Sequence, residues 1–135
     1  MAAKYLLDTN IISELVRRPQ GEVADRITRE GEKSICTSIV VACELRFGAA
    51  KIGSKKLVKQ VDLILSAMEV QPLEVPSDEE YALVRNHLEA RGTPVGPNDL
   101  LIAAHALALD CTVVTANHRE FSRVPGLRVE IWLTS

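Results

Sequence analysis

The chain has 135 residues, of which 47% are hydrophobic, and its net charge is −2. A chain of this length can bury roughly two thirds of its unfolded surface, so we expect one domain over residues 1–135. The slightly negative charge argues against a protein coated in positive charge for bulk nucleic-acid binding.

Short strand-like runs alternate with helical runs along the whole chain. The predicted strands cover residues 4–7, 34–37, 70–75, 112–115 and 128–132, and the predicted helices cover residues 9–18, 22–29, 39–51, 55–70, 77–92 and 98–109. Gly53 and Ser54 separate two of these helices, and Ser77 with Glu80 forms a predicted capping box. Pro72 indicates an edge strand. The alternation predicts an α/β fold with a mostly parallel sheet covered by helices on both faces.

The three cysteines, Cys36, Cys43 and Cys111, form no C-x-x-C pair and lie within apolar runs. We interpret them as reduced core residues of a cytoplasmic protein. No histidine keeps ligand spacing with a cysteine, which disfavours a zinc site. The N-terminal apolar run is too short for a signal peptide, and no segment reaches the ~18 apolar residues of a membrane span, so we expect no membrane association.

Four acids stand near the ends of predicted elements. Asp8 follows the first strand, Glu44 interrupts the apolar run of the helix from residue 39, Asp99 begins the helix from residue 98, and Glu120 follows the strand that ends at Thr115. Each acid also has a local explanation: a helix cap for Asp8, solvent exposure for Glu44, a favourable helix dipole for Asp99, and an exposed loop for Glu120. Functional groups of open parallel sheets gather beyond the carboxyl ends of the strands, so we expect these acids to converge.

Converging carboxylates need compensation for their charge. Two unit charges ~4 Å apart repel by roughly 4 kcal/mol at an effective dielectric of 20. A proton shared between two acids would suit acid–base chemistry, and a divalent cation would offset the charge of all four acids. Oxygen ligands favour Mg²⁺ or Mn²⁺ over zinc, and such sites commonly act on phosphates. We also expect the helix dipole to keep Asp99 ionised at neutral pH, with Asn98 capping that helix.

A basic segment runs from Leu45 to Val61 and contains no acidic residue. Its charges are either a solvated helix surface or a patch for a phosphate backbone. The candidates for contact with such a phosphate backbone are Arg46, Lys51 and Lys55.

Four blocks of the chain together carry a family resemblance: "LLDTNIISEL" at 6–15, "SIVVACELRFGA" at 38–49, "GTPVGPNDLLIAAHAL" at 92–107 and "TVVTANHREFSRVPGL" at 112–127. In this order and spacing they resemble the PIN-domain ribonucleases, and among these the VapC toxins of type II toxin–antitoxin systems. The resemblance implies a three-layer α/β/α fold and a metal-dependent endoribonuclease that hydrolyses RNA phosphodiester bonds with Mg²⁺ or Mn²⁺.

The resemblance also assigns roles to residues. Asp8, Glu44 and Asp99 match the family's three core acids and would be the metal ligands. Glu120 is the fourth catalytic candidate, because many members have an acid where this chain has Asn117 and others have one three residues later. The expected supporting groups are Asn10, Thr115 and Asn117.

The resemblance further implies a VapB-type antitoxin that covers the site, and a homodimer or a larger toxin–antitoxin assembly. Two other classes stay open. A phosphatase or phosphoacceptor domain also begins with an aspartate after its first strand, although Asn10 stands where its second aspartate is usual. A non-catalytic PIN-like binding module is the alternative reading. The RNA that is cut, whether messenger, transfer or ribosomal, is also open.

Overall fold

Five parallel strands form a central sheet in the order β3-β2-β1-β4-β5 within residues 3–133, the part of the chain that this computed structural model describes. The strands are β1 (Tyr5–Leu7), β2 (Ile35–Ser38), β3 (Glu69–Gln71), β4 (Thr112–Val114) and β5 (Val129–Glu130). In the central register Leu6 lies between Cys36 of β2 and Val113 of β4. The all-parallel pairing confirms the predicted sheet, and β3, which Pro72 follows, lies at its edge as predicted.

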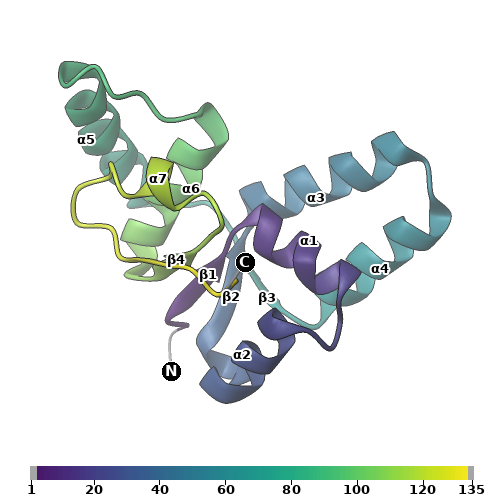
Figure 1. Cartoon of the computed structure of the whole chain (residues 1–135). Coiled ribbons are helices and arrows are strands. Elements are labelled where there is room, and N and C mark those ends of the chain that lie inside the picture. The colour runs from purple at the N-terminus through teal and green to yellow at the C-terminus, as the bar shows by residue number, and fades with distance from the viewer. Residues whose placement is uncertain (1–2, 134–135) are drawn as a thin grey trace.

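Helices cover both faces of the sheet, which confirms the three-layer α/β/α fold (Figure 1). One side carries α1 (Thr9–Arg17), α2 (Glu22–Glu30), α3 (Ile39–Ile52) and α4 (Lys55–Ser66), and the other carries α5 (Ser77–Ala90) and α6 (Pro97–Leu109). A 3₁₀ turn (Glu32–Ser34) precedes β2, and a one-turn helix, α7 (His118–Phe121), follows β4. This division agrees with the right-handed crossovers that parallel strands require.

Several boundaries differ from those predicted. The helix expected over 55–70 ends at Ser66, and the strand expected over 70–75 is only Glu69–Gln71, because pairing with β2 draws these residues into the sheet. The capping box at Ser77 is wrong: Pro76 is the N-cap of α5, and no side chain caps the helix. The predicted break at Gly53 is confirmed, since Gly53 ends α3 with a left-handed φ of 77°.

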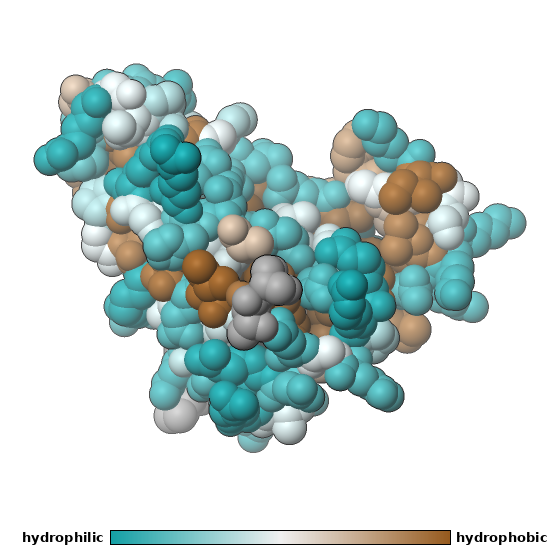
Figure 2. Space-filling model, viewed as in Figure 1, coloured by the Kyte–Doolittle hydropathy of each residue, from teal (hydrophilic) through white to brown (hydrophobic). Residues whose placement is uncertain are grey.

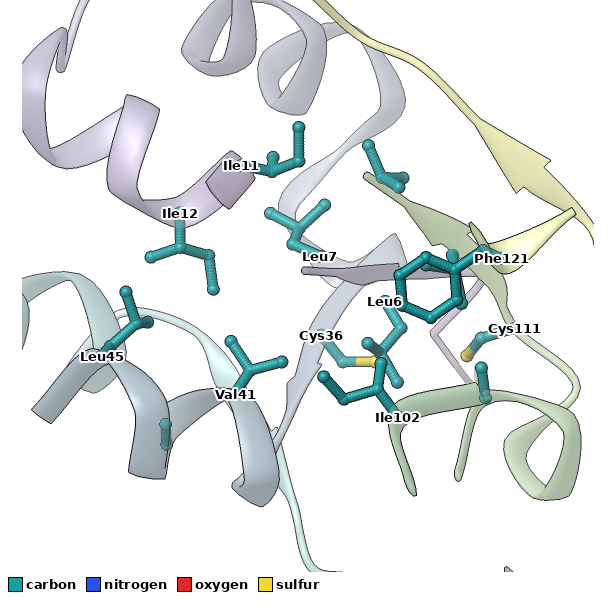
Figure 3. Packing of buried hydrophobic residues seen from close by; sticks show 14 of the residues in the cluster. Leu6, Leu7, Ile11, Ile12, Cys36, Val41, Leu45, Ile102, Cys111 and Phe121 are labelled. Atoms are coloured by element: carbon teal, nitrogen blue, oxygen red, sulfur yellow. The ribbon is translucent and has the colours of Figure 1, made fainter. Parts of the chain in front are cut away.

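The core lies around the middle strand, with helix side chains packed onto both faces (Figure 3). Leu6 and Leu7 of β1 are fully buried, as are Ile11 and Ile12 of α1, while Phe121 holds α7 against the core. The packing of Ile11 and Ile12 fixes α1, and with it the position of the first acid of the site.

The cysteines are free, but they are not all core residues. Cys36 and Cys111 are buried as expected, whereas Cys43 is exposed, because it lies on the face of α3 that turns away from the sheet. None of the helices within residues 3–133 is long and apolar enough to cross a membrane.

The strand order reverses between β1 and β4. From β1 the chain proceeds to β2 and β3 on one side, and from β4 it proceeds to β5 on the other. Ligand sites of open α/β sheets lie at such a switch point, beyond the carboxyl ends of the strands. Asp8 directly follows β1 and Thr115 directly follows β4, so both stand at this point.

Candidate active site

Asp8 is both the N-cap of α1 and a buried carboxylate at the switch point. Its Oδ1 accepts a hydrogen bond from the Thr9 backbone N–H at 2.8 Å, and its Oδ2 accepts one from the Thr115 hydroxyl at 2.7 Å. The residue is 3% exposed. This burial raises the pKa of the Asp8 carboxyl despite the two hydrogen bonds, which lower it. Asp8 therefore caps α1 and also stands at the carboxyl end of the first strand, where the sequence predicts it.

Glu44 reaches out of α3 toward two other helices. Its Oε1 accepts a hydrogen bond from the Thr9 hydroxyl at 2.6 Å, and its Oε2 accepts one from the Asn98 side-chain amide at 3.1 Å. The half-buried carboxylate therefore has partners on α1 and α6, which explains how a charge is tolerated within the apolar run of α3.

Asn117 joins the remaining two acids. Its side-chain amide donates to Asp99 Oδ2 at 2.9 Å and to Glu120 Oε2 at 2.7 Å. The other oxygen of Glu120 accepts a short hydrogen bond from the Gly96 backbone N–H, just before α6. Asn117 and Glu120 thus hold the N-terminus of α6, and Asp99 with it, against the end of β4.

The two acids held by Asn117 have pKa values shifted in opposite directions. Burial, followed by the charges of Asp8 and Glu120, raises the pKa of Asp99 to about 7. The Gly96 N–H holds the pKa of Glu120 below its ordinary value. Of this pair, Asp99 therefore binds a proton more readily than Glu120, and it is partly protonated at neutral pH.

Two expectations for the start of α6 are therefore wrong. The dipole does not keep Asp99 fully ionised, because a dipole contributes only about 0.3–1 kcal/mol at an exposed helix end and is outweighed by burial and two like charges. Asn98 does not cap the helix: the N-cap is Gly96, and the Asn98 side chain donates to Glu44.

Thr115 and Asn10 hold the acid-bearing segments together. The Thr115 hydroxyl donates to Asp8 and accepts from the Asn117 backbone N–H at 2.8 Å. Asn10 Oδ1 accepts from the Ala116 backbone N–H at 3.1 Å, which ties α1 to the loop after β4. Through these hydrogen bonds Thr115 orients the Asp8 carboxylate, and Asn10 orients the backbone after β4.

The acids open onto a shallow pocket of about 410 Å³, which we call the acid pocket. It is lined by Asp8, Thr9, Asn10, Ser13, Arg17, Glu44, Asp99 and Asn117. Three of the four predicted catalytic acids thus share one pocket, whereas Glu120 is absent from its lining and binds Asn117 and Gly96 instead.

Sequence reasoning missed four of the contributing residues. Thr9 and Asn98 bind Glu44, and Ser13 and Arg17 line the acid pocket. A signal was available for three of them: Thr9 directly follows Asp8, and Thr9, Ser13 and Arg17 are spaced four residues apart, so they share one face of α1.

The basic residues predicted to contact RNA lie outside the acid pocket. Arg46 forms a short ion pair with Asp62 between α3 and α4. Lys51 and Lys55 are exposed on either side of the turn between these helices. None of Arg46, Lys51 and Lys55 is among the residues that line the pocket.

The chemistry of the acid pocket suits a hard divalent cation. Within residues 3–133, no three histidine, cysteine or acidic side chains stand close enough together to form a ready ligand set. However, the pocket offers carboxylate, amide and hydroxyl oxygens with neither sulfur nor imidazole, which is the donor set of Mg²⁺ and Mn²⁺. Burial raises the pKa values of Asp8 and Asp99, and the charges of neighbouring acids raise them further; a cation would offset this repulsion.

The PIN domain family matches residues 5–127, a span that includes every acid of the pocket. This chain belongs to the PIN-domain family. Two nucleases are similar to this chain over nearly their whole length. The Ribonuclease VapC2 of Rickettsia felis is 35% identical over 130 residues, covering 95% of this chain and 97% of the relative. A tRNA(fMet)-specific endonuclease VapC of Salmonella typhimurium is 33% identical, covering 96% and 98%.

Solved structures agree with this membership. The DNA-bound VapBC of Salmonella typhimurium contains a chain with a TM-score of 0.91 and 32% identity, covering 97% of this chain and 99% of that one. VapBC2 of Rickettsia felis bound to a promoter DNA fragment gives a TM-score of 0.85 and 32% identity, with 96% and 98% covered. This PIN domain therefore has the VapC type of fold.

Proposed function

We propose that this PIN domain, spanning residues 1–135, is an endoribonuclease that hydrolyses RNA phosphodiester bonds and is the toxin of a type II toxin–antitoxin system. The observation that carries the proposal is the acid pocket, in which Asp8, Glu44 and Asp99 meet at the switch point of a PIN-domain sheet. Named ribonucleases that are 31–35% identical over nearly the full chain support the same activity.

Asp8, Asp99 and Glu44 are the proposed ligands of Mg²⁺, for which Mn²⁺ can substitute. The bound ion supplies charge neutralisation for the scissile phosphate and lowers the pKa of the attacking water. Thr115 orients Asp8, and Asn117 orients Asp99 together with Glu120. Glu44, which Thr9 and Asn98 hold by hydrogen bonds, lines the same pocket and is the group that we expect to orient the water.

We assign Glu120 a positioning role in this site. Its carboxylate contacts Asn117 and the Gly96 N–H and does not line the acid pocket. After burial and the charge of Asp8, the charge of Glu120 also contributes to the raised pKa of Asp99. Asp99 must be deprotonated to hold a metal ion, so Glu120 affects metal affinity through its neighbour.

The proposed partner is a VapB-type antitoxin, because the structural neighbours are toxins solved in VapBC complexes. A homodimer and an assembly with the antitoxin are the proposed forms of the protein, and the cytoplasm is the proposed location. Transfer RNA is the first substrate to test, since a relative 33% identical is named a tRNA(fMet)-specific endonuclease.

The function is tested with the Asp8→Asn variant. Asparagine is as good an N-cap as aspartate, so the variant should keep the thermal midpoint of the wild type within a few degrees. Removal of the negative charge of Asp8, a proposed metal ligand, should lower the rate of tRNA(fMet) cleavage by about a hundredfold or more.

The wild type, freed of antitoxin, should cleave with Mg²⁺ or Mn²⁺ and not in EDTA, and its induction alone should arrest growth. Cleavage of equal rate by Asp8→Asn, or cleavage that EDTA leaves unchanged, would contradict the assigned site. The matched control is Asp78→Asn, which replaces an exposed aspartate in the first turn of α5.

A further inference from the structure

One face of α1 borders the acid pocket along its whole length. Thr9, Ser13 and Arg17 lie four residues apart on this face and all three line the pocket, while Ile12 and Val16 turn into the core. A rise of 1.5 Å per residue places Arg17 about 12 Å along the helix from Thr9. The face therefore extends from the carboxylates to a cation at the pocket's rim.

Arg17 is the only positively charged residue among the described residues that line the acid pocket. The same lining contains three acids, Asp8, Glu44 and Asp99. An RNA strand that enters carries a negative phosphate on each side of the bond to be cut, and these flanking phosphates meet carboxylates. A guanidinium at the rim supplies the opposite charge and can bind a phosphate through two N–H groups.

The ion pairs around Arg17 leave it available for such a contact. Glu14 accepts hydrogen bonds from Arg17 at 3.1 Å and from Arg18 at 2.7 and 2.9 Å. If Arg17 turns toward a phosphate, Arg18 still neutralises Glu14. Exposed ion pairs contribute little to stability, and the Arg17 side chain is 63% exposed. Arg17 can therefore exchange Glu14 for a phosphate without the loss of a strong bond.

The surface around Arg17 favours a strand that passes along α1. A second, apolar hollow of about 380 Å³ lies beside the acid pocket, and both are lined by Thr9, Ser13, Arg17 and Glu44. Figure 2 shows strongly hydrophilic surface over the C-terminal end of α1, next to hydrophobic surface over the outer parts of α3 and α4. Arg17 thus stands where the polar pocket meets the apolar hollow.

We propose that Arg17 binds a phosphate of the RNA close to, but not at, the bond that is cut, and that the face of Thr9, Ser13 and Arg17 guides the strand into the acid pocket. This inference rests on the proposed ribonuclease function. It replaces Arg46, Lys51 and Lys55 as the principal contact, because these residues lie outside the pocket.

The test compares Arg17→Gln with Arg18→Gln. The two arginines are adjacent, both bind Glu14 and both have side chains that are 63% exposed, but only Arg17 lines the acid pocket. In the first arm, binding of a fluorescein-labelled single-stranded RNA of random sequence is measured by anisotropy in EDTA. Arg17→Gln should weaken binding about tenfold, and Arg18→Gln less than twofold.

Salt and a conservative variant separate a phosphate contact from a structural effect. The slope of log affinity against log salt concentration should become shallower by about 0.7 in Arg17→Gln, as expected for one lost phosphate contact on a single strand. Arg17→Lys should restore the wild-type slope and part of the affinity, because it keeps the charge and loses the two-pronged geometry. Equal binding by Arg17→Gln and Arg18→Gln, or an unchanged salt slope, would overturn the inference.

A second arm measures cleavage of the same RNA with Mg²⁺. Arg17→Gln should raise KM about tenfold and leave kcat within twofold, because the phosphate contact lies away from the reacting atoms. A fall in kcat with KM unchanged contradicts the proposed role. A wild type that binds this RNA through Arg17 but cleaves neither it nor tRNA contradicts the ribonuclease function and leaves the binding result intact, so the two failures are distinguishable.

Discussion

Removal of the Asp99 charge should abolish activity and, without metal, make the protein more stable at alkaline pH. Burial and the charges of Asp8 and Glu120 raise the pKa of Asp99 from 3.8 to about 7. A folded-state pKa above the unfolded value favours the folded state fully below about pH 4, and this contribution is lost as the pH rises through 7. In the Asp99→Asn variant the side chain at position 99 is uncharged at every pH, so the variant should not show this loss.

The size of the effect follows from the shift. About 3 pKa units correspond to about 4 kcal/mol at 1.36 kcal/mol per unit, and because Asp99 is half-exposed we expect about half of this after solvent screening. In EDTA, the unfolding free energy of the wild type relative to Asp99→Asn should therefore fall by about 2 kcal/mol between pH 4 and pH 8.

Urea unfolding followed by circular dichroism measures this difference. Asp78→Asn, in the first turn of α5 and outside the acid pocket, controls for a charge lost at a helix start and should run parallel to the wild type. Addition of Mg²⁺ at pH 8 should stabilise the wild type and leave Asp99→Asn unchanged. Parallel profiles of wild type and Asp99→Asn in EDTA would refute the argument that uncompensated carboxylates dominate this pocket.

Two further predictions concern the hydrogen bonds that hold the site. Thr9→Val removes the hydroxyl that donates to Glu44 at 2.6 Å, so kcat for RNA cleavage should fall about tenfold. Thr9→Ser keeps the hydroxyl and should keep the wild-type kcat. A Thr9→Val enzyme as fast as Thr9→Ser would contradict the role of Thr9 in holding Glu44. His105→Leu removes the partner of the buried Ser38 hydroxyl, which lies 2.8 Å from His105 Nδ1, and should cost about 1–3 kcal/mol at pH 7. Burial lowers the pKa of His105, so the wild type loses stability as the pH falls below 6.5. The cost of His105→Leu should therefore be smaller at pH 5 than at pH 7. Urea unfolding midpoints at both pH values test this, and equal costs would show that His105 does not titrate as argued.

The central fold was predictable because its signals are local. The alternation of apolar strands with amphipathic helices indicates a parallel sheet, and Pro72 correctly indicated an edge. The boundary near residue 68 was not predictable, because β3 exists only through its pairing with β2, a strand more than thirty residues away. The four-residue helix α7 is too short for any periodicity to reveal it, and its position depends on the burial of Phe121.

The identity of the acids came from the sequence, and their partners and protonation did not. Asp8, Glu44 and Asp99 were singled out because each stands near the end of an element, where a parallel sheet collects functional groups. Thr9 and Asn98 as partners of Glu44, Asn117 as the link between two acids, and the raised pKa of Asp99 all depend on side chains from different helices. Hydrogen bonds act over a few ångströms, and only the packed chain brings Asp8, Glu44 and Asp99 to one pocket and Glu120 close enough to shift the pKa of Asp99. The sequence by itself determined which groups are available for chemistry, whereas the tertiary structure decided which of them face the pocket and in which direction their pKa values are shifted.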